Sequence, residues 1–262
     1  MDAPLHEQRG RQGIPTALHG AELHPIALTD IRAILLDIEG TTTPIEFVQQ
    51  VLFPYARTRI HDYLEQHADD PGVRADIALL RAEHAAESLG APDLPPWNPE
   101  AYVYWLMDRD RKSTGLKALQ GRIWEAGFRA GALKGKGAVY PDVWPALARW
   151  QQAGKRIAIF SSGSVQAQRN LFANTTDGDL SSFLSGYFDT TTGPKREARS
   201  YRQIAATLGQ EPRDVLFISD VTAELDAARA AGMRTVLCVR DAVSPDDASA
   251  NHPRIRSFAE LA

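Results

Sequence analysis

Four short apolar segments recur along the chain, and each is followed by small, polar or acidic residues. They are Ile31–Leu36, Arg156–Phe160, Asp214–Ile218 and Arg234–Val239. Uninterrupted apolar runs of this length are typical of strands that are buried on both faces of a parallel sheet. In open sheets of this kind ligands bind at the carboxyl ends of the strands. The pattern therefore predicts a buried sheet whose polar strand ends are candidates for chemistry.

Helical periodicity fills the intervals between the later strands. We expect helices over Pro141–Ala153, Val165–Ala173, Glu197–Leu208 and Val221–Ala231. Gly154, Gly209 and Gly232 close three of them, as glycine commonly does at helix C-termini. A strand alternating with a helix predicts right-handed βαβ units. The expected fold class is α/β, with a doubly wound, mostly parallel sheet.

The interval between the first two strands is too long for one crossover, and its pattern is helical almost throughout. Candidate helices are Phe47–Gln66, Val73–Ser88, Glu100–Arg109 and Ser113–Ala130. We therefore expect an inserted all-helical cap domain over residues 45–136, which would exclude water from a site beneath it. Residues 30–44 and 137–262 would form the α/β core domain. Residues 1–29 are expected to be a loosely ordered N-terminal tail.

Composition excludes several classes of protein. The chain has 262 residues, of which 44% are hydrophobic and 24% charged, as in ordinary globular proteins. A formal net charge of −4 does not favour a nucleic-acid partner. No apolar run reaches the roughly 18 residues of a membrane span, and the N-terminus lacks a signal-peptide core. We expect a cytoplasmic protein without a membrane partner, in which Cys238 is a buried strand thiol.

Two carboxylates stand where the first predicted strand ends. Asp37 and Glu39 are two residues apart and precede Gly40. This spacing presents both side chains on one face, and two acids so placed repel each other unless a cation or a proton intervenes. The pair is a candidate Mg²⁺ site with a nucleophile and an acid/base. For an isolated pair, a helix-capping acid beside a solvated Glu is the alternative.

The ends of the later strands bear on this choice. Ser161 and Ser162 precede a helix, where hydroxyls and free amides bind phosphate oxygens, simple capping being the alternative. Lys195 also precedes a helix and could neutralise phosphate charge, unless it is a surface lysine. Asp220 offers Mg²⁺ a further oxygen, and Glu224 fits either a metal ligand or a solvated residue. Together these elements predict a phosphoryl-transfer site. Nucleotide P-loop, dinucleotide and serine-hydrolase motifs do not occur.

From Ile31 onward the chain resembles the haloacid-dehalogenase superfamily of phosphotransferases. Where that superfamily has Asp-x-Asp, this chain has Asp37-Ile38-Glu39, which resembles the enolase-phosphatase (acireductone synthase) family of methionine salvage. The resemblance is carried further by the segments 40–45, 51–56, 112–121 and 161–168.

The resemblance implies a Mg²⁺-dependent enzyme with one ion per subunit, usually monomeric. Its substrate would be 2,3-diketo-5-methylthiopentyl 1-phosphate, which it would enolise and then dephosphorylate to the acireductone. Asp37 would form an aspartyl phosphate, and Glu39 would act as the acid/base. Ser161, Ser162 and Lys195 would hold the phosphoryl group. Asp37, Asp220 and the backbone carbonyl of Glu39 would hold Mg²⁺.

Three other functions remain open at this stage. They are a phosphatase acting on another small phosphate ester, a phosphate-sensing protein without catalysis, and a metal-independent dehalogenase. Asp37, Lys195 and Asp220 argue against the phosphate-sensing protein, and Glu39 and Asp220 argue against the dehalogenase. The enolisation base is open, with Glu39 one candidate. Phe47 and Trp105 could cover the methylthio tail or pack in a core.

Overall fold

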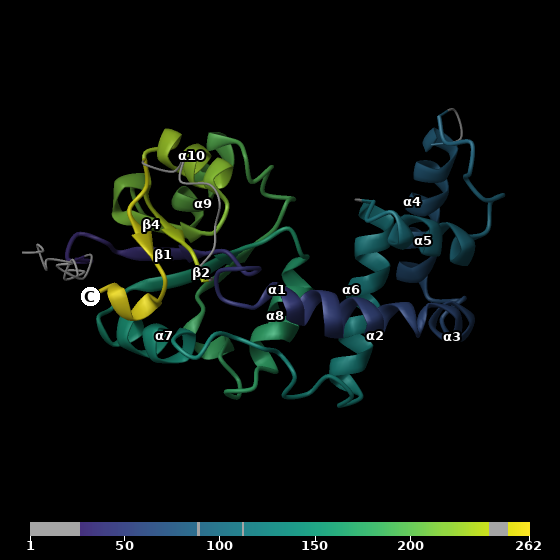
Figure 1. The fold of residues 1–262 in the computed structure, drawn as a ribbon, viewed down its shortest axis with the longest axis horizontal. Helices are drawn as coiled ribbons and strands as arrows, with labels where there is room; N and C mark the ends of the chain where they lie inside the picture. Colours follow the sequence, from purple (N-terminus) through teal and green to yellow (C-terminus); the bar gives the residue numbers. More distant parts are fainter. Residues whose placement is uncertain (1–26, 88–89, 112, 241–250) are drawn as a thin grey trace, which may run out of the picture.

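The computed structural model describes residues 27–87, 90–111, 113–240 and 251–262. Its centre is a six-stranded sheet in the order β3-β2-β1-β4-β5-β6. The strands are β1 (Ala33–Leu36), β2 (Arg156–Phe160), β3 (Gly186–Phe188), β4 (Val215–Ser219), β5 (Arg234–Cys238) and β6 (Arg254–Ile255). Every neighbouring pair is parallel. The predicted α/β fold is confirmed, with β1 in the interior of the sheet (Figure 1). Most of the predicted tail, residues 1–26, lies outside the described residues.

Alternate residues of the strands pack on opposite faces of the sheet. Ile34 and Leu36 belong to one hydrophobic cluster, whereas Ala33 and Leu35 belong to another. Helices α7 (Val143–Gln152) and α8 (Val165–Ala173) cover the first face, and α9 (Ala198–Thr207) and α10 (Thr222–Ala230) cover the second (Figure 1). Burial on both faces explains why the strands read as continuous apolar runs.

Local sequence explains where these helices begin and end. In α7 the buried residues Val143, Ala146, Leu147 and Trp150 follow helical spacing and form its inner face. The chain leaves α7 through Gly154, whose φ of 73° is the left-handed conformation that glycine adopts without steric cost. The apolar face packs α7 on the sheet, and the turn at Gly154 then leads the chain back into β2.

Two strands are absent from the prediction. Strand β3 has three residues, of which only Phe188 is buried, and β6 has two. Segments this short show no recognisable period. They add to the two edges of the sheet because their backbones pair with β2 and β5.

The inserted segment is helical, as predicted, but its first helix is interrupted. Instead of one helix over Phe47–Gln66, the chain forms α1 (Ile45–Phe47), a π-helical segment (Val48–Leu52), α2 (Phe53–Arg57) and α3 (Ile60–Gln66). Pro54 has no N–H to donate to an α-helical bond, which accounts for the wider turn before it. After α2 the Thr58 hydroxyl donates to the carbonyl of Pro54 and the helix ends.

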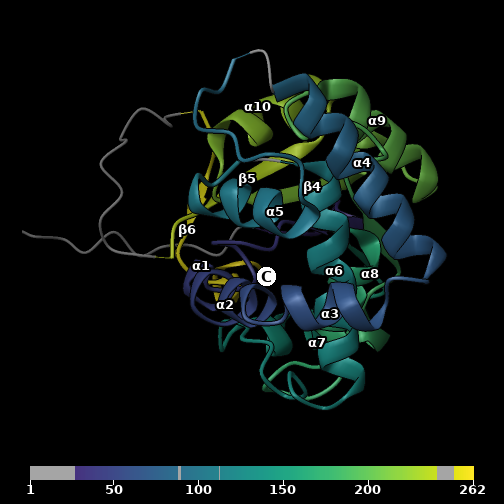
Figure 2. The same ribbon diagram turned by 90° about the vertical axis from the view of Figure 1, so that its right-hand side faces the viewer.

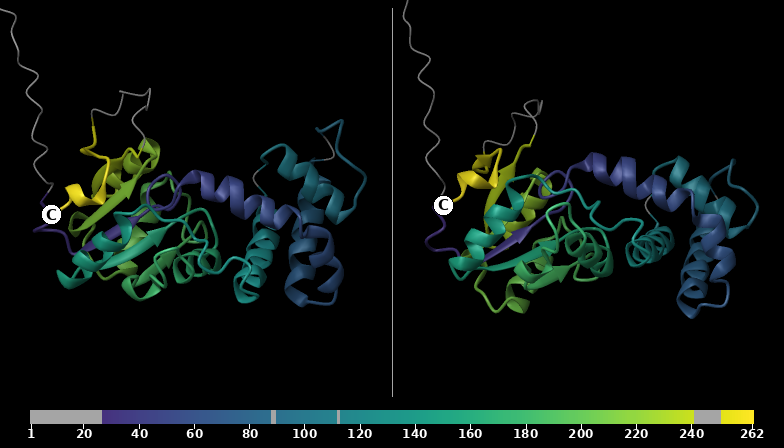
Figure 3. Two further views of the ribbon diagram at one scale, coloured as in Figure 1. Left: turned by 60° about the horizontal axis from the view of Figure 1, so that its bottom comes forward. Right: turned by 90° about the horizontal axis from the view of Figure 1, so that it is seen from below.

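Helices α4 (Pro71–Glu87), α5 (Pro99–Asp108) and α6 (Thr114–Arg129) complete the cap. The last residue of the predicted helix Val73–Ser88 and Lys112 of the predicted cap motif lie outside the described residues. The cap stands at one end of the core, beyond α1 and α2 (Figures 2 and 3). It has its own hydrophobic cluster, which includes Ile60, Leu80, Tyr102, Leu106, Leu119 and Ile123.

Two aromatic residues connect the cap to the core. Tyr55 and Trp124 each pack against both the cap cluster and the cluster on the α7 face of the sheet. The Trp124 indole N–H donates to the carbonyl of Leu52 at 2.7 Å. Phe47 and Leu52 are buried in the core cluster although they belong to the inserted segment. The base of the cap is therefore packed as part of the core.

Cys238 is fully buried in β5, as predicted, and burial raises the pKa of its thiol to about 12. This thiol therefore stays protonated and packs as an apolar side chain. Among the residues that the structure describes, no helix is both long enough and apolar enough to cross a membrane.

Candidate active site

The sheet register brings the predicted residues to one edge. Leu36, the last residue of β1, is paired with Ile159 of β2 and with Ile218 of β4. One residue further, the backbone N–H of Asp37 still donates to the carbonyl of Ile218 at 3.0 Å. Asp37 therefore continues the central strand, and the residues that follow β2 and β4 flank it.

Asp37 is 5% exposed and is held by three donors. Its Oδ1 accepts from the backbone N–H of Ile38 at 2.7 Å and from Nζ of Lys195 at 2.8 Å, and its Oδ2 accepts from Oγ of Ser219 at 3.0 Å. These contacts fix the plane of the carboxylate at the end of the central strand. The predicted nucleophile and the predicted lysine are thus in direct contact.

Lys195 is a buried cation rather than the surface lysine of the alternative. Its side chain is 11% exposed, and Nζ also lies 2.6 Å from Oε2 of Glu224. The hydroxyl of buried Tyr201 donates to the Lys195 carbonyl at 2.6 Å, which fixes its backbone. Burial alone disfavours the charged lysine, but the carboxylates of Asp37 and Glu224 outweigh it and raise the pKa of Lys195.

The contacts of Glu224 show that it is not the solvated residue of the alternative. Its carboxylate accepts from Lys195 and, at 3.3 Å, from Oγ of Ser219, so it contacts the lysine that contacts Asp37. Burial, followed by the charge of Asp37, raises the pKa of Glu224 to about 7. Ser219 was not among the predicted residues. Ser219 directly precedes Asp220 at the end of β4, and this position was the sequence signal that could have identified it.

Asp220 lies against the loop that carries Glu39. A Cβ on Gly40 would lie 2.3 Å from Oδ2 of Asp220, so only glycine leaves room for this carboxylate. The residue as a whole is exposed, but its carboxylate lies against the backbone of Gly40. Desolvation of this carboxylate, followed by the charge of Asp37, raises the pKa of Asp220 to about 6.

The pair Asp37 and Asp220 fits a divalent cation. The charge of Asp37 contributes to the raised pKa of Asp220, and a cation between two such carboxylates relieves this repulsion. Within the described ranges no three Asp, Glu, His or Cys side chains converge on one metal position. Mg²⁺ does not need three, because it usually takes one or two carboxylates and keeps several waters.

Glu39 lies on a tight loop at the mouth of the site. Gly40 has a φ of 69°, and the carbonyl of Ile38 accepts the N–H groups of Thr41, Thr42 and Thr43. Oγ1 of Thr42 also donates to the carbonyl of Asp37 at 3.0 Å. The side chain of Glu39 is exposed, which leaves it accessible to a substrate.

Ser161 and Ser162 follow β2 at the amino end of α8. Ser161 is buried, Ser162 is exposed, and Ser164 caps the helix by accepting from the N–H of Ala167 at 3.2 Å. The predicted capping role thus belongs to Ser164 and leaves Ser162 available. Buried Gln168, the last residue of the segment 161–168, donates to the Gly163 carbonyl at 2.8 Å and holds this loop.

The cap reaches the site through α6. This helix packs against α8, and a Cβ on Gly121 would lie 3.5 Å from Oγ of Ser164. Phe47 is 5% exposed in the core cluster, and Trp105 is 7% exposed and stacks on Tyr102 inside the cap. Both side chains therefore follow the packing alternative in this structure.

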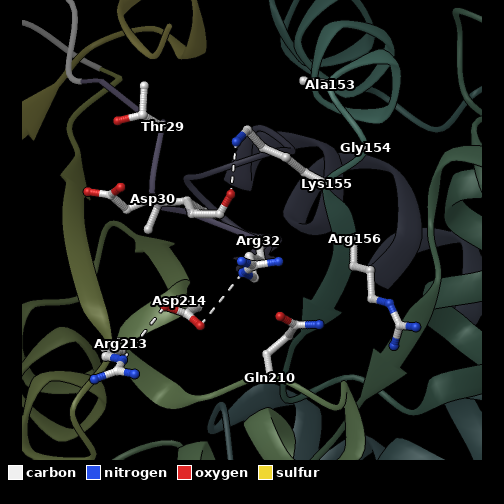
Figure 4. Close-up of a pocket in the computed structure, with 11 residues that line it drawn as sticks. Thr29, Asp30, Arg32, Ala153, Gly154, Lys155, Arg156, Gln210, Arg213 and Asp214 are labelled. Atoms are coloured by element: carbon white, nitrogen blue, oxygen red, sulfur yellow. Dashed lines mark hydrogen bonds and ion pairs between the residues drawn. The ribbon is translucent and has the colours of Figure 1, made fainter.

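A separate cavity of about 590 Å³ lies at the opposite end of the sheet (Figure 4). Arg32 and Asp214, which precede β1 and β4, and Arg156, the first residue of β2, line it. Lys155 borders it and donates to the carbonyls of Leu28 and Ile31 at 2.8 and 2.9 Å. None of the predicted site residues is among the described residues that line it. This cavity is therefore separate from the candidate active site.

The fold and this edge define a hydrolase of the haloacid dehalogenase-like class, whose family model matches residues 31–232. An Enolase-phosphatase E1 of Synechococcus elongatus is 54% identical, covering 90% of this chain and 99% of the relative. That of Pseudomonas aeruginosa is 47% identical, covering 88% and 98%. The solved UTR4 protein (Unknown transcript 4 protein) of Saccharomyces cerevisiae is 33% identical with a TM-score of 0.69, covering 88% of this chain and 100% of that one.

This chain belongs to the enolase-phosphatase E1 family. The predicted enolase-phosphatase function is confirmed by these relatives. The chain is a phosphatase enzyme, and hydrolases of this class are generally metal-dependent.

Proposed function

We propose that the chain converts 2,3-diketo-5-methylthiopentyl 1-phosphate to 1,2-dihydroxy-3-keto-5-methylthiopentene and phosphate, with Mg²⁺ as the metal. The ion pair between Asp37 and Lys195 at the end of the central strand carries the proposal. Family membership supports the choice of substrate. A monomer acting in the cytoplasm is part of the same proposal.

Asp37 is the nucleophile of this proposal. An oxygen of its carboxylate attacks phosphorus, the bond between phosphorus and the ester oxygen breaks, and an aspartyl phosphate forms. The donors Lys195, Ser219 and the Ile38 N–H hold the carboxylate in one orientation before the substrate arrives. This preorganisation spares the enzyme the cost of aligning the nucleophile during the reaction.

Glu39 is the acid/base. It gives a proton to the leaving ester oxygen and later takes one from the water that attacks the aspartyl phosphate, which releases phosphate and restores Asp37. Its exposed side chain, on the loop next to Asp37, supports this role. Glu39 is also one candidate for the enolisation base.

The phosphoryl group lies between the residues that follow β2 and Lys195. The hydroxyls of Ser161 and Ser162 and the ammonium of Lys195 would donate to its oxygens. The side chains of Asp37 and Asp220 and the backbone carbonyl of Glu39 would hold Mg²⁺. When bound, Mg²⁺ would polarise the phosphoryl oxygens and offset their charge in the transition state.

The cap covers this edge and excludes water from it. We propose the division into a cap of residues 45–136 and a core of residues 30–44 and 137–262. The separate hydrophobic cluster of the cap supports this division. The contact of α6 with α8 supports its place above the phosphate subsite.

Following acireductone absorbance and phosphate release together tests the proposal. Parent enzyme is expected to show both signals, to lose phosphate release on chelation, and to regain it with Mg²⁺. Glu39→Gln should strongly slow phosphate release while retaining the fold. Phosphate release without the acireductone signal in the parent would contradict the substrate, and normal phosphate release by Glu39→Gln would contradict the acid/base role.

A further inference from the structure

Arg240, just after β5, makes a clamp between distant parts of the chain. Its Nε and Nη2 both donate to the carbonyl oxygen of Thr41, at 2.9 and 2.7 Å. Its Nη1 donates to Oδ1 and Oδ2 of Asp142, at 2.8 and 2.7 Å. The guanidinium faces the rings of Tyr140 and Phe258 at 4.3 and 4.5 Å, and the side chain is 6% exposed.

The carboxylate at the far end of this clamp is itself fixed. Oδ2 of Asp142 also accepts from the hydroxyl of Ser257 at 2.9 Å and from the backbone N–H of Phe258 at 2.5 Å. The carboxylate of Asp142, at the start of α7, is therefore held both by Arg240, which follows β5, and by the C-terminal segment. A planar guanidinium between such an anchor and two aromatic rings has little freedom to move.

The near end of the clamp is the loop of the active site. The Thr41 N–H donates inward to the carbonyl of Ile38, whereas the Thr41 carbonyl receives both hydrogen bonds from Arg240. Thr41 and Glu39 belong to one tight loop, in which the Gly40 N–H also donates to the Thr43 carbonyl at 2.9 Å. A shift of Thr41 therefore displaces the loop that carries Glu39.

We propose that Arg240 is a positioning residue for the reaction: by holding the Thr41 carbonyl it orients Glu39 for proton transfer. This inference rests on the proposed acid/base role of Glu39. Arg240 has no contact with reacting atoms in this arrangement. Its effect is on the placement of the acid, which must be within hydrogen-bond reach of the proton it moves.

The chain offers a matched control for a purely structural role. Arg149 of α7 donates through Nη2 to the carbonyls of Phe258 and Leu261, both at 3.0 Å. It fastens the same C-terminal segment as Arg240 by the same kind of bond, but among the described residues it does not bond to the loop of Thr41. Loss of Arg149 should lower stability without moving Glu39.

A double-mutant cycle tests the inference through phosphate release from the diketo phosphate. We expect Arg240→Met to lower kcat by about 100-fold, the scale of a misplaced catalytic group, with a much smaller change in KM. Arg240→Lys should recover only part of kcat, because an ammonium lacks the planar fork. In a Glu39→Gln background, Arg240→Met should cost little more, because residues that act through one another are not additive.

Two outcomes would overturn the inference. One is an equal fold-loss from Arg240→Met with and without Glu39. Another is an equal kcat loss in Arg149→Met at a comparable loss of melting temperature. If Arg240→Met does not fold, Arg240→Lys takes its place in the cycle. If Glu39→Gln alone releases phosphate normally, the proposed acid/base role fails, and that arm of the cycle identifies this failure separately.

Discussion

Glu224 and Lys195 form a buried ion pair behind the nucleophile, with Nζ 2.6 Å from Oε2 of Glu224 and 2.8 Å from Oδ1 of Asp37. One ammonium thus lies between two carboxylates. The arrangement keeps Lys195 charged in a site that burial would otherwise discharge, and it directs one of its protons at Asp37.

Replacing Glu224 by Gln should therefore weaken the placement of Lys195 and leave the metal site intact. We expect kcat for phosphate release to fall roughly tenfold, as is common for groups that orient an active-site residue. The Mg²⁺ concentration for half-maximal activity should stay close to that of the parent. Asp220→Asn is the comparison, and it should raise that concentration strongly. A large rise in Glu224→Gln would instead make Glu224 a metal ligand.

Replacing Lys195 by Met should lower phosphate release by about 100-fold or more, because it removes a preorganised donor for the phosphoryl charge and leaves Asp37 and Glu224 facing each other. Rapid-mix measurement of phosphate release checks this. Lys155→Met is the control, since that lysine bonds to backbone carbonyls at the other end of the sheet. The control should lower the melting temperature and keep kcat. A matching loss of kcat there would refute the prediction.

Gly40→Ala should damage the site beyond the cost of its backbone conformation. The left-handed φ of 69° costs a non-glycine residue about 1–2 kcal/mol, and the new methyl would overlap the carboxylate of Asp220. Gly154→Ala has a similar φ of 73° with no atom within 4 Å of the added Cβ. Denaturant unfolding and metal titration of both variants separate the two effects. Only Gly40→Ala should lose Mg²⁺-dependent activity, and equal behaviour would argue against the overlap.

The Asp142 ion pair should make stability depend on pH in acid. Burial opposes its charge, but the hydrogen bond from Arg240 and the N–H of Phe258 lower its pKa below the usual 3.8. A carboxylate with a lowered pKa in the folded state stabilises fully above the unfolded value, and this stabilisation is lost as pH falls through the folded value. At pH 7 Asp142→Asn should cost about 3 kcal/mol of unfolding free energy.

The difference between Asp142→Asn and the parent should then shrink as the pH falls below 3.8. Urea unfolding at a series of pH values measures it. Asp30→Asn, at an exposed ion pair with Arg234, should change stability little at any pH. A difference that persisted unchanged in acid would show that packing, and not ionisation, makes Asp142 important.

Sequence predicted the parts of the site that follow strands. Asp37, Ser161 and Asp220 come directly after apolar runs, and a parallel sheet gathers such residues at one edge whatever their distance in the chain. The pattern alone left Lys195 open between the site and the surface, because the residues before α9 give no sign that its side chain is buried, and the family resemblance assigned it to the phosphoryl group.

The contacts between side chains could not be predicted in this way. The pairing of Glu224 with Lys195 and the bond of Arg240 to Thr41 depend on rotamers and on how helices pack across the sheet. The interruption of the first cap helix depends on Pro54 and on the hydroxyl of Thr58, both of which lie inside an otherwise helical pattern. Local pattern reports burial, whereas these features are set by tertiary geometry.

Tyr55 and Trp124 pack against both hydrophobic clusters, so the hinge of the cap lies at these two residues. It does not lie at residues 45 and 136, where the inserted segment begins and ends. Phe47 and Leu52 lie on the core side of this hinge, so the first turns of the insert would stay fixed to the core while the rest of the cap moved. If the cap rotates relative to Asp37, the rotation axis would pass near Tyr55 and Trp124, where the hydrogen bond from Trp124 to Leu52 holds the two parts together. Gly127 leaves the space that the Tyr55 ring occupies at this hinge, because a Cβ there would lie 2.5 Å from the Tyr55 hydroxyl oxygen.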